Sequence, residues 1–189
     1  MLIDLVKKNR SYRRFFENEL ISRETLLTLI ELARLSPSGA NRQPLKYYVS
    51  YEKEQNEKIF PSLAWAGYLK DWQGPEAGER PTGYIVIVQD ENYKMTNPAD
   101  TGIAAQTILL GAVEAGLGGC MIASIQKTML RAALNIPETQ DILLVLALGK
   151  PKETVVIDTM TPDGDVKYWR DENQVHHVPK RSLTEIILN

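Results

Sequence analysis

Residues 98–120 read PADTGIAAQTILLGAVEAGLGGC, and this stretch decides the fold. Its first part, about residues 98–116, is predicted to be a helix with apolar side chains on most sides, and such a helix must be buried. A central core helix of a monomer or a helix shared with a second subunit would satisfy this requirement. The apolar positions are Ile103, Ala104, Ala105, Ile108, Leu109, Leu110, Ala112, Val113 and Ala115.

Glycines follow this helix directly. Gly116 suits the position that ends a helix, but a helix end does not require the further glycines Gly118 and Gly119. Adjacent glycines let a planar ligand approach backbone N–H groups, although a tight turn explains them equally well. The run is neither a Walker phosphate loop, because Gly-Lys-Ser/Thr is missing, nor a Rossmann fingerprint, because it follows a helix.

The rest of the chain mixes helices and strands without a regular βαβ rhythm, which favours an α+β fold over a doubly wound one. Unbroken apolar runs predict strands covered on both faces at 84–88 and 142–148. Further strands are expected at 45–51 and 119–123, with strand-like pieces around 165–178. Helices are expected at 2–9, 22–35 (capped by Ser22), 53–63 (broken near Pro61), 126–135 and from Ser182, and a loop at 72–83.

The composition indicates one soluble domain over residues 1–189. Lys and Arg total 22 and Asp and Glu 24, so the net charge of −2 gives no footprint for nucleic acid. Any anionic ligand then needs a local cluster of cations. No apolar run reaches the roughly 18 residues of a membrane span, no signal peptide is evident, and the one cysteine allows no internal disulfide. We therefore expect a cytoplasmic protein.

Three polar segments could hold a ligand. Arg10-Ser11-Tyr12-Arg13-Arg14 places three arginines in five residues, and arginine suits phosphate. Lys180 and Arg181 stand just before the short C-terminal helix, where an anion is favoured. Residues 36–44, SPSGANRQP, offer short polar side chains. Each segment alone is better explained as solvated surface charge or as a well-made turn than as a ligand site.

The sequence gives little support for a metal site or for a reactive cysteine. His176 and His177 are adjacent, so in a strand they point to opposite faces and cannot bind one metal ion together. We expect no metal site. Cys120 stands in an apolar context and is interpreted as structural.

Taken together, these segments resemble the nitroreductase family of flavoproteins. Arg-Ser-x-Arg-x-Phe matches residues 10–15, Ala-x-x-Ser-Pro-Ser-x-x-Asn-x-Gln-Pro matches residues 33–44, and Asp-x-Gly-x-Ala-x-Gln followed by Gly-Leu-Gly-x-Cys matches residues 100–120. Leu-Gly-x-Pro at 148–151 and the Pro-Lys-Arg tail complete the order. The resemblance implies a central, mainly antiparallel sheet flanked by helices. It also implies an intertwined homodimer with two FMN sites made by both subunits.

The resemblance also implies roles for individual residues. The FMN phosphate and ribityl chain would be held by Arg10, Ser11, Lys180 and Arg181, and Arg13 would lie at the pyrimidine end of the flavin. Gly118 and Gly119 would run beside the ring and offer N–H groups to its N5–O4 edge. The partner subunit would contribute Pro37, Ser38, Asn41 and Gln43.

The implied activity is ping-pong transfer of hydride from NAD(P)H through FMN to a small acceptor such as a nitroaromatic or quinone, with no catalytic side chain. A non-catalytic FMN-binding or redox-sensing module, and a flavin-consuming or dehalogenating enzyme, remain alternatives. The chain departs from the family at Asn9 and Leu45. Residues 65–80 match no family motif, so Trp65, Tyr68, Lys70 and Trp72 could face the pocket or simply pack.

Overall fold

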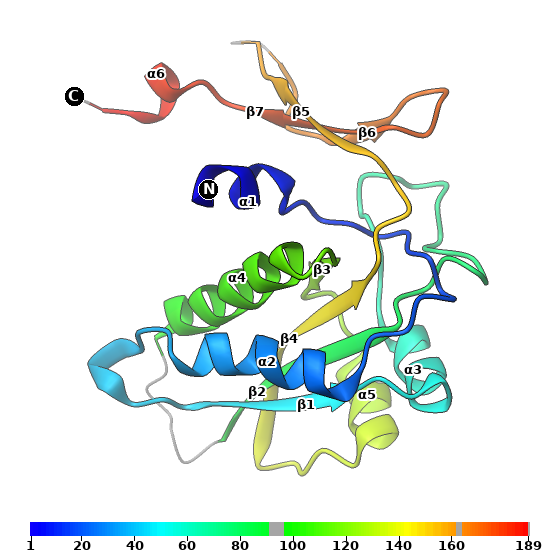
Figure 1. Cartoon of the computed structure of the whole chain (residues 1–189), viewed down its shortest axis with the longest axis vertical. Helices are drawn as coiled ribbons and strands as arrows, with labels where there is room; N and C mark the ends of the chain where they lie inside the picture. Colours follow the sequence, from blue (N-terminus) through cyan, green and yellow to red (C-terminus); the bar gives the residue numbers. More distant parts are fainter. Residues whose placement is uncertain (91–96, 162–163, 189) are drawn as a thin grey trace.

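The fold is built on a four-stranded sheet in the order β1-β2-β4-β3, with every neighbouring pair antiparallel (Figure 1). The computed structural model describes residues 1–90, 97–161 and 164–188. This sheet confirms the predicted α+β class. Its strands are β1 (Leu45–Ser50), β2 (Gly83–Asp90), β3 (Gly118–Ile122) and β4 (Gln140–Gly149).

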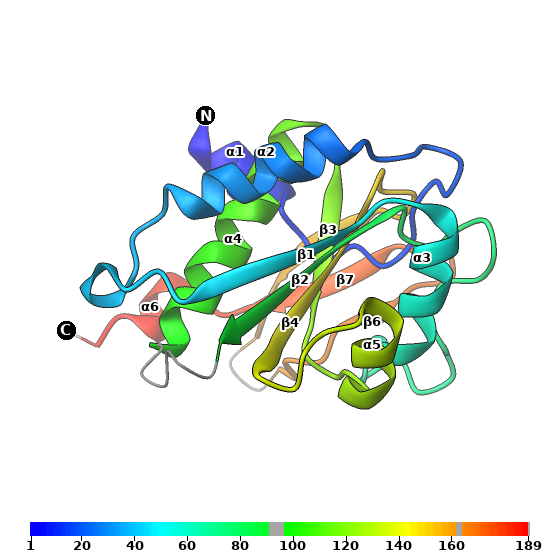
Figure 2. The same ribbon diagram turned by 90° about the horizontal axis from the view of Figure 1, so that it is seen from below.

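Helices cover both faces of the sheet, as Figure 2 shows. Ile85 and Ile87 of β2 pack in one cluster with α2 (Arg23–Arg34) and α4 (Pro98–Glu114). Alternate residues such as Val86 belong to a second cluster with α3 (Lys53–Ile59) and α5 (Lys127–Leu134). Because successive side chains of a strand point to opposite faces, β2 and β4 need the unbroken apolar runs that the sequence shows.

Helix α4 begins and ends where its sequence predicts. The Asn97 side chain accepts a hydrogen bond from the backbone N–H of Ala99. At the other end Gly116 adopts a φ of +73°, and the N–H of Leu117 donates to the carbonyl of Ala112 at 2.8 Å, which is a Schellman end. Burial on all sides is not complete in this chain, because Ile103 remains 38% exposed.

The N-terminal arm follows α1 (Leu2–Lys8) and runs along the outer edge of β3. Ser11 forms a parallel bridge with Gly119, and Phe15 forms an antiparallel bridge with Pro151. Phe15 is completely buried. The arm therefore joins residues 9–16 to the strand that carries the glycine pair.

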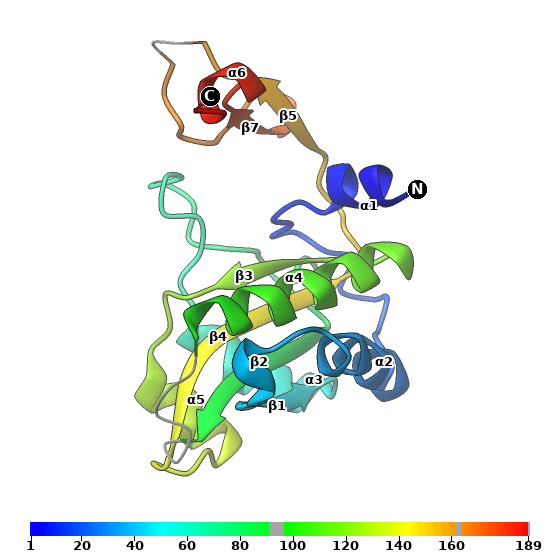
Figure 3. The same cartoon turned by 90° about the vertical axis from the view of Figure 1, so that its left-hand side faces the viewer.

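A second sheet, in the order β5-β7-β6, stands apart from the first beyond α1 (Figure 3). The sequence did not predict β5, although Val155-Val156-Ile157 carries the β-branched signal of a strand. The strands are β5 (Val155–Thr159), β6 (Trp169–Arg170) and β7 (His176–Lys180), followed by α6 (Leu183–Ile186).

The remaining elements agree with the sequence within one or two residues. Ser22 caps α2 by accepting from the N–H of Thr25, and a 3₁₀ turn over Phe60–Ser62 follows α3 at Pro61. Within the described ranges, no helix combines the length and apolarity that a membrane crossing requires. That residues 1–189 form a single domain stays a prediction.

Candidate functional site

The glycine pair of β3 is held between the N-terminal arm and the rest of the sheet. The N–H of Tyr12 donates to the carbonyl of Gly119 at 3.0 Å. A Cβ at Gly118 would lie 2.5 Å from Tyr12 Cδ2, and one at Gly119 would lie 2.7 Å from the carbonyl oxygen of Ala147. Packing inside one protomer therefore already requires both glycines. That they also offer N–H groups to a ligand stays a prediction.

Arg10 lies at the start of this arm with part of its donor capacity unused. Its Nη2 donates to the carbonyl of Val6 at 2.9 Å, near the end of α1. Its Nε is buried and has no hydrogen-bond partner within the described part of the chain. A buried N–H without an acceptor is costly, so an anion that accepts a hydrogen bond from this Nε–H would remove that cost.

Arg13 reaches a cavity of about 210 Å³ beside β3. The cavity is lined by residues 120–124, residues 64–67 and Tyr168. The guanidinium lies 4.8 Å from the centre of the Tyr168 ring, and its Nη1 is 3.3 Å from Nε2 of His176. Arg13 is only 8% exposed. It therefore brings a positive charge to a partly enclosed space.

His176 supports Arg13 as a neutral group. Burial lowers the pKa of His176 to about 4, and the charges of Arg13 and Arg170 add to the effect. A guanidinium can only donate, so Nε2 of His176 accepts and the ring proton sits on Nδ1. His177 lies on the other face of β7, stacked on Trp169 at 4.1 Å. The two histidines thus point to opposite faces, as the sequence indicates.

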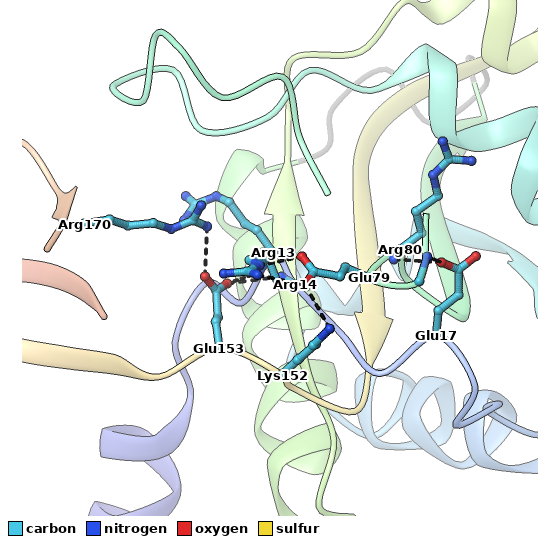
Figure 4. A network of polar contacts seen from close by, with 9 residues as sticks. Arg13, Arg14, Glu17, Glu79, Arg80, Lys152, Glu153 and Arg170 are labelled. Carbon is cyan, nitrogen blue, oxygen red and sulfur yellow. Dashed lines mark hydrogen bonds and ion pairs between the residues drawn. The ribbon is translucent and has the colours of Figure 1, made fainter. Parts of the chain in front are cut away.

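Behind Arg13 lies a buried carboxylate that the sequence analysis did not identify (Figure 4). Oε1 of Glu153 accepts from the backbone N–H groups of Arg13 and Arg14. Oε2 accepts from Arg170 at 2.9 Å, and the Glu153 side chain is 0% exposed. Its only signal in the sequence is a position two residues after the Leu-Gly-x-Pro motif.

A second carboxylate fixes the arm from the opposite side (Figure 4). Glu79 pairs with Arg14 at 2.5 Å and with Lys152 at 2.9 Å. The Arg14 hydrogen bond, followed by that of Lys152, outweighs burial and lowers the pKa of Glu79 to about 2. Residues from the N-terminal arm, the loop before β2 and the segment after β4 are thereby tied together.

The loop over residues 37–43 is organised by the first turn of α4. Ser38 Oγ donates to Asp100 Oδ2 at 3.0 Å, and the N–H of Gly39 donates to Oδ1 at 2.9 Å. Asn41 and Gln43 adopt positive φ angles of 54° and 50°. Non-glycine residues held in this region are enriched at functional sites. Pro37, Ser38 and Gln43 border a cavity of about 260 Å³.

This loop and the glycine pair lie at opposite ends of α4. The helix has 17 residues, so at about 1.5 Å per residue it separates them by about 25 Å. The fold of this chain therefore does not bring Pro37–Gln43 to the cavity at Arg13. Lys180 and Arg181 lie at the end of β7, and in the described ranges no hydrogen bond or ion pair joins them to Arg10 or Ser11.

The aromatic side chains of residues 65–80 divide between the cavity and the second sheet. Trp65 lines the cavity. Tyr68 packs on Tyr168 at 4.9 Å, and Arg170 lies 4.3 Å above the ring of Trp72. Lys70 is exposed and does not line the cavity. This segment thus connects the cavity wall to β6.

Two further expectations concern a metal site and the Cys120 thiol. Within residues 1–90, 97–161 and 164–188, no group of three His, Cys, Asp or Glu side chains could hold a metal ion. Cys120 is 3% exposed, and burial raises the pKa of its thiol. A buried thiol with a raised pKa is a poor nucleophile, which agrees with a structural role.

Known proteins share both the sequence pattern and the fold. Residues 6–150 match the model of the nitroreductase family. An iodotyrosine deiodinase of Thermotoga neapolitana is 26% identical over 171 residues (81% of this chain, 90% of the relative). A 4-nitrobenzoate reductase of Pseudomonas putida is 24% identical over 202 residues (83% and 88%).

Solved structures agree with this assignment. A nitroreductase family protein from Streptococcus pneumoniae TIGR4 superposes with a TM-score of 0.70 at 18% identity, covering 100% of both chains. An NADPH:FMN oxidoreductase from Vibrio harveyi gives a TM-score of 0.62 at 21% identity, covering 80% of this chain and 69% of that one. The family match, over most of the sequence and supported by the fold, shows that this chain belongs to the nitroreductase family of oxidoreductases.

Proposed function

We propose that this chain works as a homodimeric, FMN-dependent NAD(P)H oxidoreductase that reduces small acceptors such as nitroaromatics or quinones. The observation that carries the proposal is the cavity beside β3, where the buried Arg13 meets an open stretch of residues 121–124. Bound FMN would supply the hydride chemistry, accepting hydride from the nicotinamide and passing it to the acceptor.

The residues present fit a phosphorylated flavin. Arg10 has a buried Nε–H without a partner in the described part of the chain, which suits a phosphate oxygen. Ser11 is exposed next to it. Arg13 supplies a cation for the pyrimidine end, and Trp65 and Met121 give the cavity flat or flexible apolar walls. These residues supply the positive charge that the cofactor needs and part of the wall of its site.

The contribution of the protein is electrostatic and steric. Arg13 stabilises negative charge that develops beside it, because a fixed cation in a partly enclosed site costs no reorganisation. His176 accepts from Arg13 without adding a competing positive charge, since its pKa is about 4. Trp65 and Tyr168 form aromatic parts of the cavity wall. No side chain is needed as a proton donor, so we name no catalytic residue.

A second copy of this chain would complete the site. The cavity of about 210 Å³ is smaller than the roughly 300–1,000 Å³ of typical ligand pockets. The Pro37–Gln43 loop is already ordered by Asp100 but lies at the far end of α4. The exposed Leu2 and Ile3 of α1 and Ile103 of α4 offer apolar surface for a partner. We assign Pro37, Ser38, Asn41 and Gln43 to the partner's site on this basis.

The first test is the absorbance spectrum of the purified protein under anaerobic conditions. We expect a yellow, dimeric protein that bleaches with NADH or NADPH and recolours when a quinone or nitroaromatic is added. A yellow protein inert to both nicotinamides would favour a flavin-binding or redox-sensing module. A colourless monomer that stays without cofactor in excess FMN would refute the proposal.

Arg10→Ala tests the phosphate assignment. Loss of a charge-assisted hydrogen bond costs about 1.5–3 kcal/mol, so the Kd for FMN should rise roughly tenfold to a hundredfold. Arg23→Ala is the matched control, since Arg23 is exposed at the start of α2. Equal FMN affinity in the two variants, measured by fluorescence titration, would remove Arg10 from the site.

The deiodinase relative supports a second candidate function, reductive dehalogenation on the same scaffold. Tyr168 lines the cavity and packs on Tyr68, so an aromatic substrate in the cavity could stack on Tyr168. The reduced protein would then release iodide from an iodinated phenol faster than it reduces a nitroaromatic. Comparing the two single-turnover rates separates the candidates.

A further inference from the structure

The buried ion pair of Glu153 and Arg170 stands directly behind Arg13 (Figure 4). Glu153 receives the backbone N–H groups of Arg13 and Arg14 on one oxygen and Arg170 on the other. The Arg170 side chain is only 8% exposed. The carboxylate thus links the N-terminal arm to strand β6, and Arg13 is the residue between them that lines the cavity.

Stability alone does not explain such a pair. The cost of removing two charges from water can exceed their mutual attraction, so apolar residues of similar volume often stabilise a fold as well or better. A fully buried carboxylate at Glu153 would be strongly destabilising without a cationic partner, although an apolar pair at 153 and 170 would need no charges at all. The presence of Arg170 calls for an explanation based on charge.

The charges near the cavity balance in a specific way. Arg13 and Arg170 are positive and Glu153 is negative, which leaves one net positive charge. His176 adds none at neutral pH. Arg14 and Lys152 share Glu79, so this group carries one further net positive charge on residues that do not line the cavity. Of these charged groups only Arg13 lines the cavity, and Arg170 offsets the charge of Glu153 next to it.

The thiol of Cys120 at the cavity wall is affected by the charges of both Arg13 and Glu153. The pKa of the Cys120 thiol is raised mainly by burial, while Arg13 opposes that rise and Glu153 adds to it. Because Cys120 lines the cavity, a ligand there would also experience the fields of Arg13 and Glu153. The potential inside the cavity thus depends on whether Glu153 is balanced.

We propose that Glu153 and Arg170 are positioning residues for Arg13. Glu153 fixes the backbone of Arg13 at the cavity, and Arg170 cancels the Glu153 charge so that Arg13 acts on bound flavin as an unopposed cation. The inference rests on the proposed function and deepens it, because it states that a buried ion pair outside the cavity wall influences the reduction potential of the flavin.

The test measures the two-electron reduction potential of the holoenzyme in four forms. Glu153→Gln should raise the potential, because it removes one negative charge. Arg170→Met should lower the potential, because it removes one positive charge. A unit charge about 10 Å away in a medium of effective dielectric about 20 changes the redox equilibrium roughly tenfold, which is about 30 mV. The double variant should return to the wild-type potential.

Two further variants separate charge from shape. Arg170→Lys keeps the charge and loses the planar fork, so its potential should stay at the wild-type value even where its stability falls. Lys127→Met removes one partner of the exposed Lys127–Asp141 pair, whose Nζ and Oδ1 are 2.8 Å apart. It should leave the potential unchanged.

The outcomes distinguish this inference from the proposed function. If no form binds FMN, the proposed function fails. If FMN binds and both single variants move the potential in the same direction or not at all, the ion pair is only structural and the inference is overturned. Should Arg170→Met not fold, the Glu153→Gln and Arg170→Lys results still decide, because a raised potential is expected for the first and an unchanged potential for the second.

Discussion

Glu79 offers the most direct test of how the N-terminal arm is held. It receives Arg14 and Lys152, and these contacts lower its pKa from 4.5 to about 2. Glu79→Gln keeps the shape of the side chain and removes the charge. The variant should therefore loosen the arm that presents Arg10 and Arg13 without opening the core.

The magnitude follows from the lowered pKa. At about 1.36 kcal/mol per pKa unit, the difference between 4.5 and about 2 is worth about 3 kcal/mol at most. Arg14 and Lys152 are 24% and 38% exposed, so solvent screens part of this interaction and we expect about 1–2 kcal/mol. Urea unfolding at fixed protein concentration measures the loss at pH 7.

The lowered pKa of Glu79 also predicts how its contribution to stability changes with pH. A carboxylate with a lowered pKa in the folded state stabilises it above about pH 5 and loses that effect as the pH falls towards 2. The difference between wild type and Glu79→Gln should therefore be full at pH 7 and shrink by pH 3. Glu76→Gln, at an exposed position nearby, is the control. A difference that stays constant from pH 7 to pH 3 would refute the ion-pair explanation.

Two other predictions concern packing and protonation. Gly119→Ala should lower the free energy of urea unfolding by about 1–3 kcal/mol, because its Cβ would lie 2.7 Å from the backbone oxygen of Ala147. Gly67→Ala has nothing within 4 Å and should change it by less than about 0.5 kcal/mol; equal losses would contradict the packing argument. His176, with a pKa of about 4, should show no titration of its ring resonances by NMR between pH 6 and 8. An inflection near pH 6.5 would show that it is not buried beside Arg13.

Local signals allowed much of the fold to be predicted. The cap at Ser22, the break at Pro61 and the end of α4 at Gly116 each depend on residues within a few positions of one another. The apolar runs of β2 and β4 predicted strands buried on both faces, because burial leaves a direct mark on composition. These elements agree with the structure almost residue by residue.

Contacts between distant residues could not be predicted in the same way. Glu153 binds the arm across 140 residues of sequence, and no local pattern indicates which carboxylate will meet which backbone N–H. The parallel pairing of β5 with β7 was missed because β5 is short and partly exposed. The sequence offers a ligand contact or a tight turn as the reason for the glycine pair, whereas the structure shows that close packing against Tyr12 and Ala147 already requires its lack of side chains.

The pairing of Ser11 with Gly119 has a consequence for the solubility of the chain. Strand β3 is the last strand of its sheet, and an uncovered outer strand is a template for pairing with other chains. Residues 11–12 occupy part of that edge through the Ser11–Gly119 bridge and the Tyr12 hydrogen bond. A protease that removes the chain up to and including Tyr12 would therefore remove Arg10 and also leave the outer edge of β3 unpaired. Proteolysis at this site would thus promote aggregation of the chain.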